Sequence, residues 1–528
     1  MPRASLLPLV ASALLCALHA TNAAQETDIT QTPNAANAGI QKSLAEQIGA
    51  GRGDALTPGS SVYLIQRDPF RAIVRGRQVF QRKFTQAQGA GPRTGDGSGD
   101  IESDASIGAG LADSCASCHG RPQGAAGFGG DVFTRPDGRD APHLFGIGLV
   151  EMLADEMSAD LRRIRASALT EASTRGATVV APLRTRGIDF GVLRAFPDGT
   201  LDTAGVDGVD PDLRVRPFFA EGSAFSIRAF LVGAFDAEMG LEAVDPDLLA
   251  ASQGGRATTP AGLLLDGTQD RIGPPPAAHA TLDPDLDGVR DEVPTSLVDY
   301  TEFYLLNYFA PAVSTREPEE AKRGLETFRD IGCATCHVPN LELRHDRRVA
   351  DVETRFDTRN GNPFNQLYAT AAARFDVVDD GTGLPPLCRP SGAPFQVRGL
   401  FSDLKRHDLG PNFHEEQFDG SIVREFVTEP LWGVASSGPY GHDGRSPSLE
   451  AVILRHGGEA QAARDAYSGL PDAHRKRVLA LLQSLVLFSP PSTASNLRPA
   501  DPTASGYPLR GHGAIDLSVL FLDPFDKE

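Results

Sequence analysis

The stretch Cys115-Ala116-Ser117-Cys118-His119 recurs in the second half of the chain as Cys333-Ala334-Thr335-Cys336-His337. Both are copies of the pentapeptide C-x-x-C-H, the covalent attachment signal of a haem c. The spacing suits this chemistry, because two thiols three residues apart add to the two vinyl groups of one porphyrin and the adjacent histidine ligates the iron. A disulfide or half of a zinc site is the alternative, but two copies that each end in histidine favour two covalent haem c groups. His119 and His337 are therefore the predicted proximal iron ligands.

The composition narrows the class of partner. The chain has 528 residues, enough for two or three domains, and its 69 acidic against 50 basic residues give a net charge of -19. This charge argues against nucleic acid or an anionic membrane surface as a partner. It allows a small, basic redox protein as an electron donor.

The N-terminal residues predict export. Residues 1–23 form a signal peptide pattern, in which Arg3 precedes an apolar core and small residues follow up to Ala23. No later segment approaches the ~20 consecutive apolar residues of a membrane span. Because haem c is attached outside the cytoplasm, we expect a periplasmic protein without a membrane span. Cys388, the one cysteine outside the signal and the two motifs, is expected to be a buried small side chain.

The sequence predicts a mainly α fold with two cytochrome c-like domains, each carrying one covalent haem c, with extended loops and little β. The predicted divisions are a signal peptide at 1–23, a flexible N-terminal extension at 24–60, an N-terminal cytochrome c-like domain at 61–253, a linker and acidic turn region at 254–313, a C-terminal cytochrome c-like domain at 314–491 and a tail at 492–528.

A helix is predicted before each haem motif. Asp68-Pro69 reads as an N-cap and first helical residue, with Phe70 to Phe84 at helical spacing, and Pro318 opens the second helix. The first contains Gly76-Arg77-Gln78-Val79-Phe80 and the second Gly324-Leu325-Glu326-Thr327-Phe328, which share the pattern G-x-x-x-F and indicate a divergent internal repeat. Further helices are expected at 143–153, 158–171, 218–239 and 478–488, and loops at 340–400.

An acidic motif lies between the two halves. Asp283, Asp285, Asp287 and Gly288 form D-x-D-x-D-G, the first half of a calcium-binding loop. An EF-hand needs glutamate at its twelfth position, where this chain has Pro294. The pattern favours a solvated acidic turn and leaves a calcium site as the alternative.

One histidine is the best candidate for the sixth ligand of the second haem. The four methionines all precede the second half, so a local His/Met pair is excluded there. His456 shares the apolar face of a predicted helix with Leu449, Val452 and Ile453, and we expect it to ligate iron. Its rival, His442, lies in a glycine-rich turn that better suits a hydrogen-bonding role around the haem.

Further motifs carry a resemblance to a known family. They are Val215–Phe218, Asp403–Gly410, Leu431-Trp432-Gly433, Gly438–Arg445, and Leu449–Ile453 with His456–Ala460. Together these motifs resemble the di-haem oxidoreductase family, which is related to the bacterial di-haem cytochrome c peroxidases and to the enzyme that matures tryptophan tryptophylquinone. The resemblance covers about 76–488. It implies that His456 stands at the sixth-ligand position of the C-terminal haem, and that the N-terminal haem has an open distal face for peroxide or dioxygen.

Two more residues are candidates for chemistry. Glu151 fits the family pattern and has the acid/base chemistry to move a proton between peroxide oxygens, with a helix-surface glutamate as the alternative and His143 as a weaker candidate. Trp432, the sole tryptophan, lies in the second half, whereas the bridging tryptophan of the peroxidases lies in their first half. Electron transfer and core packing are therefore equal interpretations of Trp432.

These features predict a periplasmic, peroxidase-like di-haem c oxidoreductase. Electrons would pass from a bis-histidine C-terminal haem to an open N-terminal haem, with a small redox protein as donor and peroxide, dioxygen or another small substrate as acceptor. Two alternatives remain: a non-catalytic di-haem electron-transfer cytochrome, and a dioxygen-using oxygenase of the rubber-cleaving type.

Overall fold

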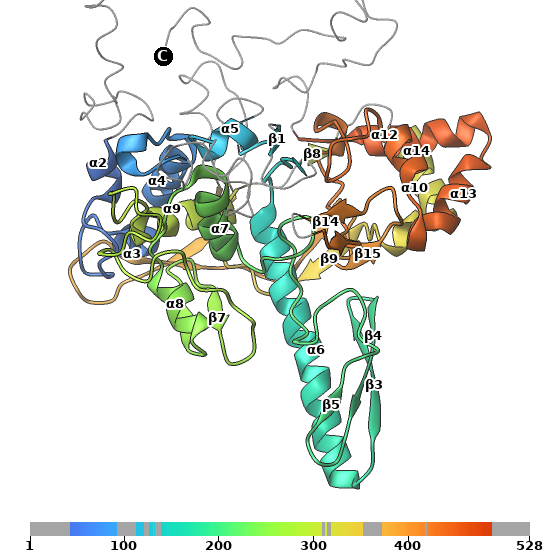
Figure 1. The fold of residues 1–528 in the computed structure, drawn as a ribbon, viewed down its shortest axis with the longest axis horizontal. Helices are drawn as coiled ribbons and strands as arrows, with labels where there is room; N and C mark the ends of the chain where they lie inside the picture. Colours follow the sequence, from blue (N-terminus) through green and yellow to red (C-terminus); the bar gives the residue numbers. More distant parts are fainter. Residues whose placement is uncertain are drawn as a thin grey trace, which may run out of the picture.

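The chain folds into two helical halves and a projecting arm (Figure 1). The computed structural model describes residues 43–91, 112–120, 126–129, 131–132, 139–308, 312–313, 318–351, 372–417 and 420–487. The fold is mainly α with some β, as predicted. The predicted signal peptide and the tail at 492–528 lie outside the described residues. Among the helices that are described, none is both long and apolar enough to cross a membrane.

The helix before the first haem motif is α4 (Pro69–Gln81), which begins where the sequence predicts and is capped by the Asp68 side chain. It packs against α9 (Thr295–Leu306), a helix buried along almost its whole length. Gly76 permits the close approach, because a Cβ there would lie 2.0 Å from the carbonyl oxygen of Tyr300. Phe84 lies beyond the end of α4 rather than on it, and its N–H donates to the carbonyl of Asp113 (2.7 Å).

The same helix pair recurs in the second half. The helix before the second motif, α10 (Pro318–Asp330), packs against α14 (Asp472–Ser484). A Cβ on Gly324 would lie 2.0 Å from the carbonyl oxygen of Arg477. The glycine of each G-x-x-x-F pattern therefore makes the same contact, which confirms the internal repeat. It also gives α9 a place in the first half that corresponds to α14, although the sequence suggested only linker and acidic turn in that region.

The described part of the predicted N-terminal extension contains regular structure. Ser43 forms a capping box with Glu46 at the start of α2 (Leu44–Ile48), and Ser60 caps α3 (Ser61–Arg67). Gln47 is buried and accepts a hydrogen bond from Arg82 (2.8 Å). Capping residues rather than an apolar period organise this segment, which is why its composition suggested a loose chain.

The projecting arm is built on α6 (Ile147–Arg175), a single helix where the sequence suggested two. Its distal half packs against β3 (Val179–Thr185) and β4 (Ile188–Ala195), with β5 (Leu201–Asp202) completing a three-stranded sheet (Figure 1). Buried and exposed residues alternate along β3, as expected for a strand with one face against a helix. Arg186 and Gly187, both at positive φ, form the tight turn of this hairpin.

Short antiparallel strands run through 340–400, where loops were expected. The strand β9 (Asn340–Leu343) pairs with β14 (Phe395–Arg398), and β12 (Phe375–Val378) pairs with β13 (Leu387–Pro390). Cys388 lies in β13 and is only partly buried, so the expected full burial of this residue is wrong. In the described part of the chain, every sheet except that of the arm has two strands. The β content is therefore higher than predicted, but dispersed.

The remaining described elements are α5 (Cys115–His119), α7 (Ile227–Met239), α8 (Pro246–Ser252), α12 (Leu449–Arg455), α13 (Gln461–Ser468), η2 (Gln86–Gln88), η3 (Cys333–Thr335), η4 (Val434–Ser436), η5 (Gly458–Ala460), β1 (Asp131–Val132), β2 (Arg139–Asp140), β6 (Arg256–Thr258), β7 (Leu264–Asp266), β8 (Ala312–Val313), β10 (Ala350–Asp351), β11 (Ala372–Ala373), β15 (Arg406–Asp408), β16 (Glu415–Glu416), β17 (Ile422–Val423), β18 (Glu425–Val427) and β19 (Leu485–Val486).

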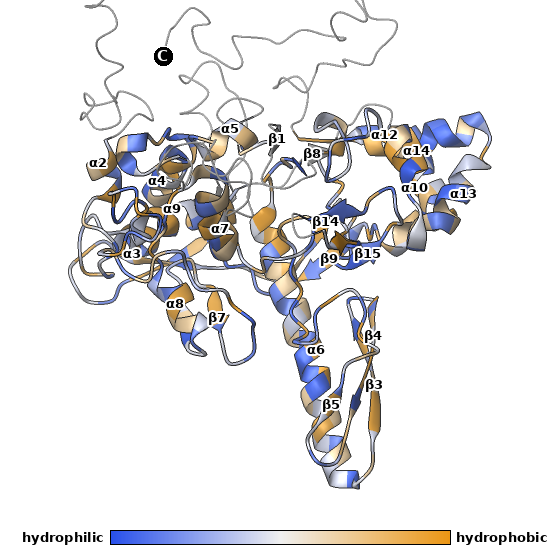
Figure 2. Cartoon of the chain, in the orientation of Figure 1, coloured by the Kyte–Doolittle hydropathy of each residue, from blue (hydrophilic) through white to orange (hydrophobic). Residues whose placement is uncertain are grey.

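The apolar core joins the two halves. Figure 2 shows apolar residues gathered on α7, α9 and the upper part of α6, whereas the outer helices α10 and α13 are more hydrophilic. The largest buried cluster contains Phe80 and Phe145 from the first half and Leu341, Trp432 and Leu487 from the second. Because residues from both halves share one core, the halves are held in a fixed relation at the cavity described next.

Candidate haem-binding site

Both C-x-x-C-H motifs open into one cavity of about 1110 Å³. Its lining includes Cys115, Cys118 and His119 from the first motif and Cys333, Cys336 and His337 from the second. Pockets for a single small ligand usually measure about 300–1,000 Å³. The cavity is thus large for one ligand, and it brings together two attachment motifs that are more than 200 residues apart in sequence.

The first motif forms the one-turn helix α5, and its histidine is fixed by the backbone. The Nδ1–H of His119 donates to the carbonyl oxygen of Pro142 (2.7 Å), and its ring lies 6.5 Å from the ring of Phe80. Burial lowers the pKa of His119. The imidazole is therefore neutral with its proton on Nδ1, and Nε2 keeps the lone pair that a metal ligand needs.

The second motif repeats this arrangement. The Nδ1–H of His337 donates to the carbonyl oxygen of Phe401 (3.1 Å), and its ring lies 6.1 Å from the ring of Phe328. Burial, reinforced by the neighbouring His456, lowers the pKa of His337 to about 4. Phe80 and Phe328 are the two phenylalanines of the G-x-x-x-F repeat, so each pattern joins a helix-packing glycine to an aromatic contact with the motif histidine.

His456 has the same hydrogen-bonding state. The sequence predicts that His456 lies within a helix. In the structure it is the C-cap of α12 and follows the last helical residue. Its Nδ1–H donates to the carbonyl oxygen of Val452 (2.7 Å), and its ring packs on Phe413 with 5.3 Å between the ring centroids. It lines the cavity close enough to His337 to lower the pKa of that residue. In His119, His337 and His456, Nδ1 is therefore engaged by a backbone carbonyl, and the lone pair of Nε2 is available to bind a metal.

Two other histidines of the cavity are engaged differently. In His143, Nε2–H donates to the carbonyl oxygen of Trp432 (2.7 Å) and Nδ1 accepts from the N–H of Phe145 (3.2 Å), so both nitrogens are occupied. The ring of His442 stacks on Phe426, 4.0 Å between centroids, with Nε2 3.6 Å from Glu415. These contacts indicate that His143 and His442 hold neighbouring segments of the cavity wall in place and do not act as metal ligands.

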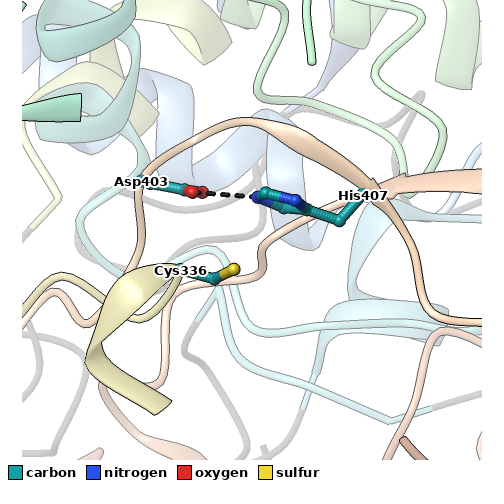
Figure 3. A group of neighbouring side chains, drawn as sticks. All are labelled: Cys336, Asp403 and His407. Carbon is teal, nitrogen blue, oxygen red and sulfur yellow. Dashed lines mark hydrogen bonds and ion pairs between the residues drawn. The ribbon is translucent and has the colours of Figure 1, made fainter. Parts of the chain in front are cut away.

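Cys336, Asp403 and His407 form a cluster that resembles a metal site (Figure 3). His407, however, contacts Asp403 through Nε2 (2.9 Å) and Glu459 through Nδ1 (2.7 Å). Burial by itself would lower the pKa of His407, but hydrogen bonds to Asp403 and Cys336 raise it to about 11. An imidazole ring with both nitrogens hydrogen-bonded to carboxylates cannot ligate a metal, so His407 is a hydrogen-bonding residue beside the second motif.

The four cysteines of the two motifs are free thiols. None of the four motif cysteines forms a disulfide in the described residues. Burial raises the pKa of Cys115 to about 12 and that of Cys333 to about 11. Thiolate ligands occur where the surroundings lower the thiol pKa, so these apolar surroundings suit uncharged thioethers.

Glu151 lies outside this arrangement. It is on α6 but fully buried, where one oxygen accepts the N–H of Ile227 (2.6 Å) and the other pairs with Arg347. Among the described residues that line the cavity, Val150 is present and Glu151 is not. Its predicted acid/base role has no support from this geometry, and the helix-surface alternative is wrong because the residue is buried.

Three further residues of the cavity wall carry groups that can transfer an electron, transfer a proton or bind iron: Trp432, Glu429 and Met239. Trp432 is buried, and its carbonyl accepts the hydrogen bond from His143, so it lies where the halves meet. Glu429 lines the cavity and is exposed, with Arg139 also on the cavity wall. Met239 also lines the cavity, at the end of α7. The sequence offered no signal for Glu429, because its environment comes from distant segments.

Comparisons with known proteins identify one matching family. Residues 393–485 match the model of a family described as "di-haem oxidoreductase, putative peroxidase", which confirms the predicted resemblance for the segment that contains Trp432, His442 and His456. Among solved structures, the chain is similar to hydrazine synthase of Kuenenia stuttgartiensis pressurised with xenon, with 17% identity over 36% of this chain and 55% of that chain and a TM-score of 0.21. No curated protein matches the chain.

Proposed function

We propose that the chain is a periplasmic di-haem c oxidoreductase of the peroxidase type. The observation that carries the proposal is the single cavity onto which both C-x-x-C-H motifs open, lined by three histidines that keep Nε2 available. The family match over residues 393–485 supports the same class.

The residues of the two motifs and His456 then have specific roles in holding the haems. Cys115 and Cys118 would hold one porphyrin, and Cys333 and Cys336 the other, with His119 and His337 as proximal ligands and His456 as the sixth ligand at the second site. When bound, the two haems would supply electron transfer from the C-terminal to the N-terminal site and activation of peroxide or dioxygen at the latter. The backbone carbonyls of Pro142, Phe401 and Val452 orient the ligands before iron is present.

Proton and electron movement need further side chains. Glu429 is our choice for the acid/base group, since it is a carboxyl residue that lines the cavity and is exposed, so it can exchange a proton with a molecule bound there. Trp432 is our choice for the connection between the two halves, because it is buried in their common core. The acidic surface favours a small basic donor, and the donor's association rate should fall as salt screens the attraction.

A second function is favoured by one observation. Met239 lies at the cavity wall in the first half, where its thioether is a suitable sixth ligand for the first haem. With both irons six-coordinate, the protein would be an electron carrier.

Ligand binding to the holoprotein distinguishes the two functions. The peroxidase proposal predicts a high-spin ferric signal from one haem, a Soret shift of that haem alone on adding cyanide, and consumption of hydrogen peroxide by the reduced protein. Glu429→Gln should slow peroxide consumption by about 100-fold or more without changing haem content.

The carrier function makes the opposite predictions. Both haems would be low-spin and unreactive toward cyanide, and Met239→Ala would be needed to open the first site. That combination would contradict the peroxidase proposal.

A further inference from the structure

Five carboxyl groups from two chain segments meet beside the first half. Glu242 follows α7, whereas Asp283, Asp285, Asp287 and Glu292 precede α9. Oxygens of Glu242, Asp285 and Glu292 all lie within 4.8 Å of one another, and so do oxygens of the three aspartates, with Asp285 common to both groups. Within the described chain, neither Glu292 nor any of these aspartates forms an ion pair with arginine or lysine.

Glu292 is the most buried acid of this cluster. Glu292 is only 3% exposed, and its Oε2 accepts a hydrogen bond from the backbone N–H of Glu242 (2.6 Å). Its Oε1 is buried without a hydrogen-bond partner, and so is Oδ1 of Asp283. The backbone of Gly89 covers the carboxyl group, since a Cβ there would lie 2.3 Å from Oε1. A buried carboxyl oxygen without a hydrogen-bond donor or a cation beside it is unfavourable. Each of the two groups of acids contains one such oxygen.

A calcium ion meets these requirements. Ca²⁺ takes six to eight oxygen ligands at about 2.3–2.6 Å, so two oxygens on opposite sides of the ion are separated by about 5 Å. The oxygen spacing within each of the two groups of three acids falls within that limit, and Mg²⁺, which keeps its waters and needs a tighter octahedron, fits less well. We propose that this cluster is a structural calcium site, in which Glu292 and Glu242 replace the glutamate that an EF-hand loop would have at Pro294.

The site would connect two helices of the first half. Glu242 lies just after α7, whose last residues line the haem cavity, and Glu292 lies just before α9, which packs against α4. An ion bound by both segments would fix the end of α7 relative to that helix pair. The solvated acidic turn favoured by the sequence does not account for the burial of Glu292.

The proposal is tested on the holoprotein, first without any substitution. Wild type dialysed against a chelator should bind Ca²⁺ in a calorimetric titration, with Mg²⁺ binding much more weakly, and its melting temperature should rise with added Ca²⁺. Absence of Ca²⁺ binding at millimolar concentration would overturn the proposal.

The variant Glu292→Gln tests the site through the sign of its stability change, which should differ between chelator and added Ca²⁺. The amide of Gln keeps the shape of the carboxyl group and removes one charge from a cluster of acids that repel one another when no ion is bound. The variant should therefore be as stable as wild type, or more stable, in chelator. With Ca²⁺ it should be less stable and bind the ion at least about tenfold more weakly, because a charged ligand is lost.

A control and a second variant complete the experiment. Asp198→Asn changes an exposed turn carboxylate at the arm and should alter neither Ca²⁺ affinity nor the calcium dependence of melting. If Glu292→Gln fails to fold, Asp285→Asn provides the affinity measurement, since Asp285 belongs to both groups of acids. A wild-type affinity in either variant would contradict the site.

Discussion

Three histidines in this cavity share one hydrogen-bonding pattern, and that pattern supports our proposal that they are the iron ligands. In His119, His337 and His456, Nδ1 donates to a backbone carbonyl and Nε2 remains free. His143 and His407 have both nitrogens engaged. The sequence predicted the first two ligands from a local motif and the third from spacing, but the distinction from the other histidines needs the long-range contacts of the fold.

His456 provides the most specific prediction about a single side chain. His456→Ala should convert the second haem from low-spin to high-spin, because the neutral Nε2 donor is lost, whereas His442→Ala should leave it low-spin. His456→Met should keep a six-coordinate haem and raise its reduction potential, since a thioether donates less electron density than imidazole. Optical and paramagnetic resonance spectra with a redox titration provide the measurements. A low-spin spectrum that survives His456→Ala and disappears in His442→Ala would move the ligand to the turn.

Acid/base residues were the least predictable side chains. Glu151 was chosen because it fits a linear pattern, yet its partners are Ile227 and Arg347, which are distant in sequence. Glu429 had no pattern at all, and only the fold brings it to the cavity wall. Motifs carry ligand positions well because ligation is local, whereas proton-transfer groups depend on the whole cavity.

The helix pairs α4–α9 and α10–α14 show which elements the sequence could predict. Capping residues and the G-x-x-x-F pattern located α4 and α10 correctly. The helix α9 was missed, because a helix buried on nearly all sides lacks the alternation of apolar and polar faces that periodicity detects. The two-stranded sheets within 340–400 were missed for a similar reason, since strands of four residues are too short to show a period.

Gly324→Ala tests the close contact between α10 and α14. The added Cβ would lie 2.0 Å from the Arg477 carbonyl, which is backbone and cannot move aside easily. We expect the free energy of unfolding to fall by about 1–3 kcal/mol, as for other overpacked sites. Gly233→Ala is the matched control, since a Cβ there would lie no closer than 3.9 Å to its nearest neighbour, a ring carbon of Phe219, and alanine favours a helix. Denaturant unfolding of both variants measures the difference, and equal stabilities would show that the glycine contact is unimportant.

The molecule as a whole places both attachment motifs on one cavity between halves that share a core. The sequence indicated two haem-binding units and an internal repeat, but it could not show that the units open onto the same space. That property depends on contacts between distant residues, such as the hydrogen bond from His143 to the carbonyl of Trp432 and the core cluster that unites Phe145 with Leu487. This arrangement supports the proposed electron transfer between two haems.

The most direct test of this account is the intact mass of the exported protein and of three variants. Wild type should carry two covalent haems, and the double variants Cys115→Ala/Cys118→Ala and Cys333→Ala/Cys336→Ala should each carry one. Cys388→Ala is the control, because that cysteine lies in β13, outside both motifs, and its loss should leave two haems. A wild-type protein with fewer than two covalent haems, or a motif variant that retains both, would contradict the assignment of one haem to each motif.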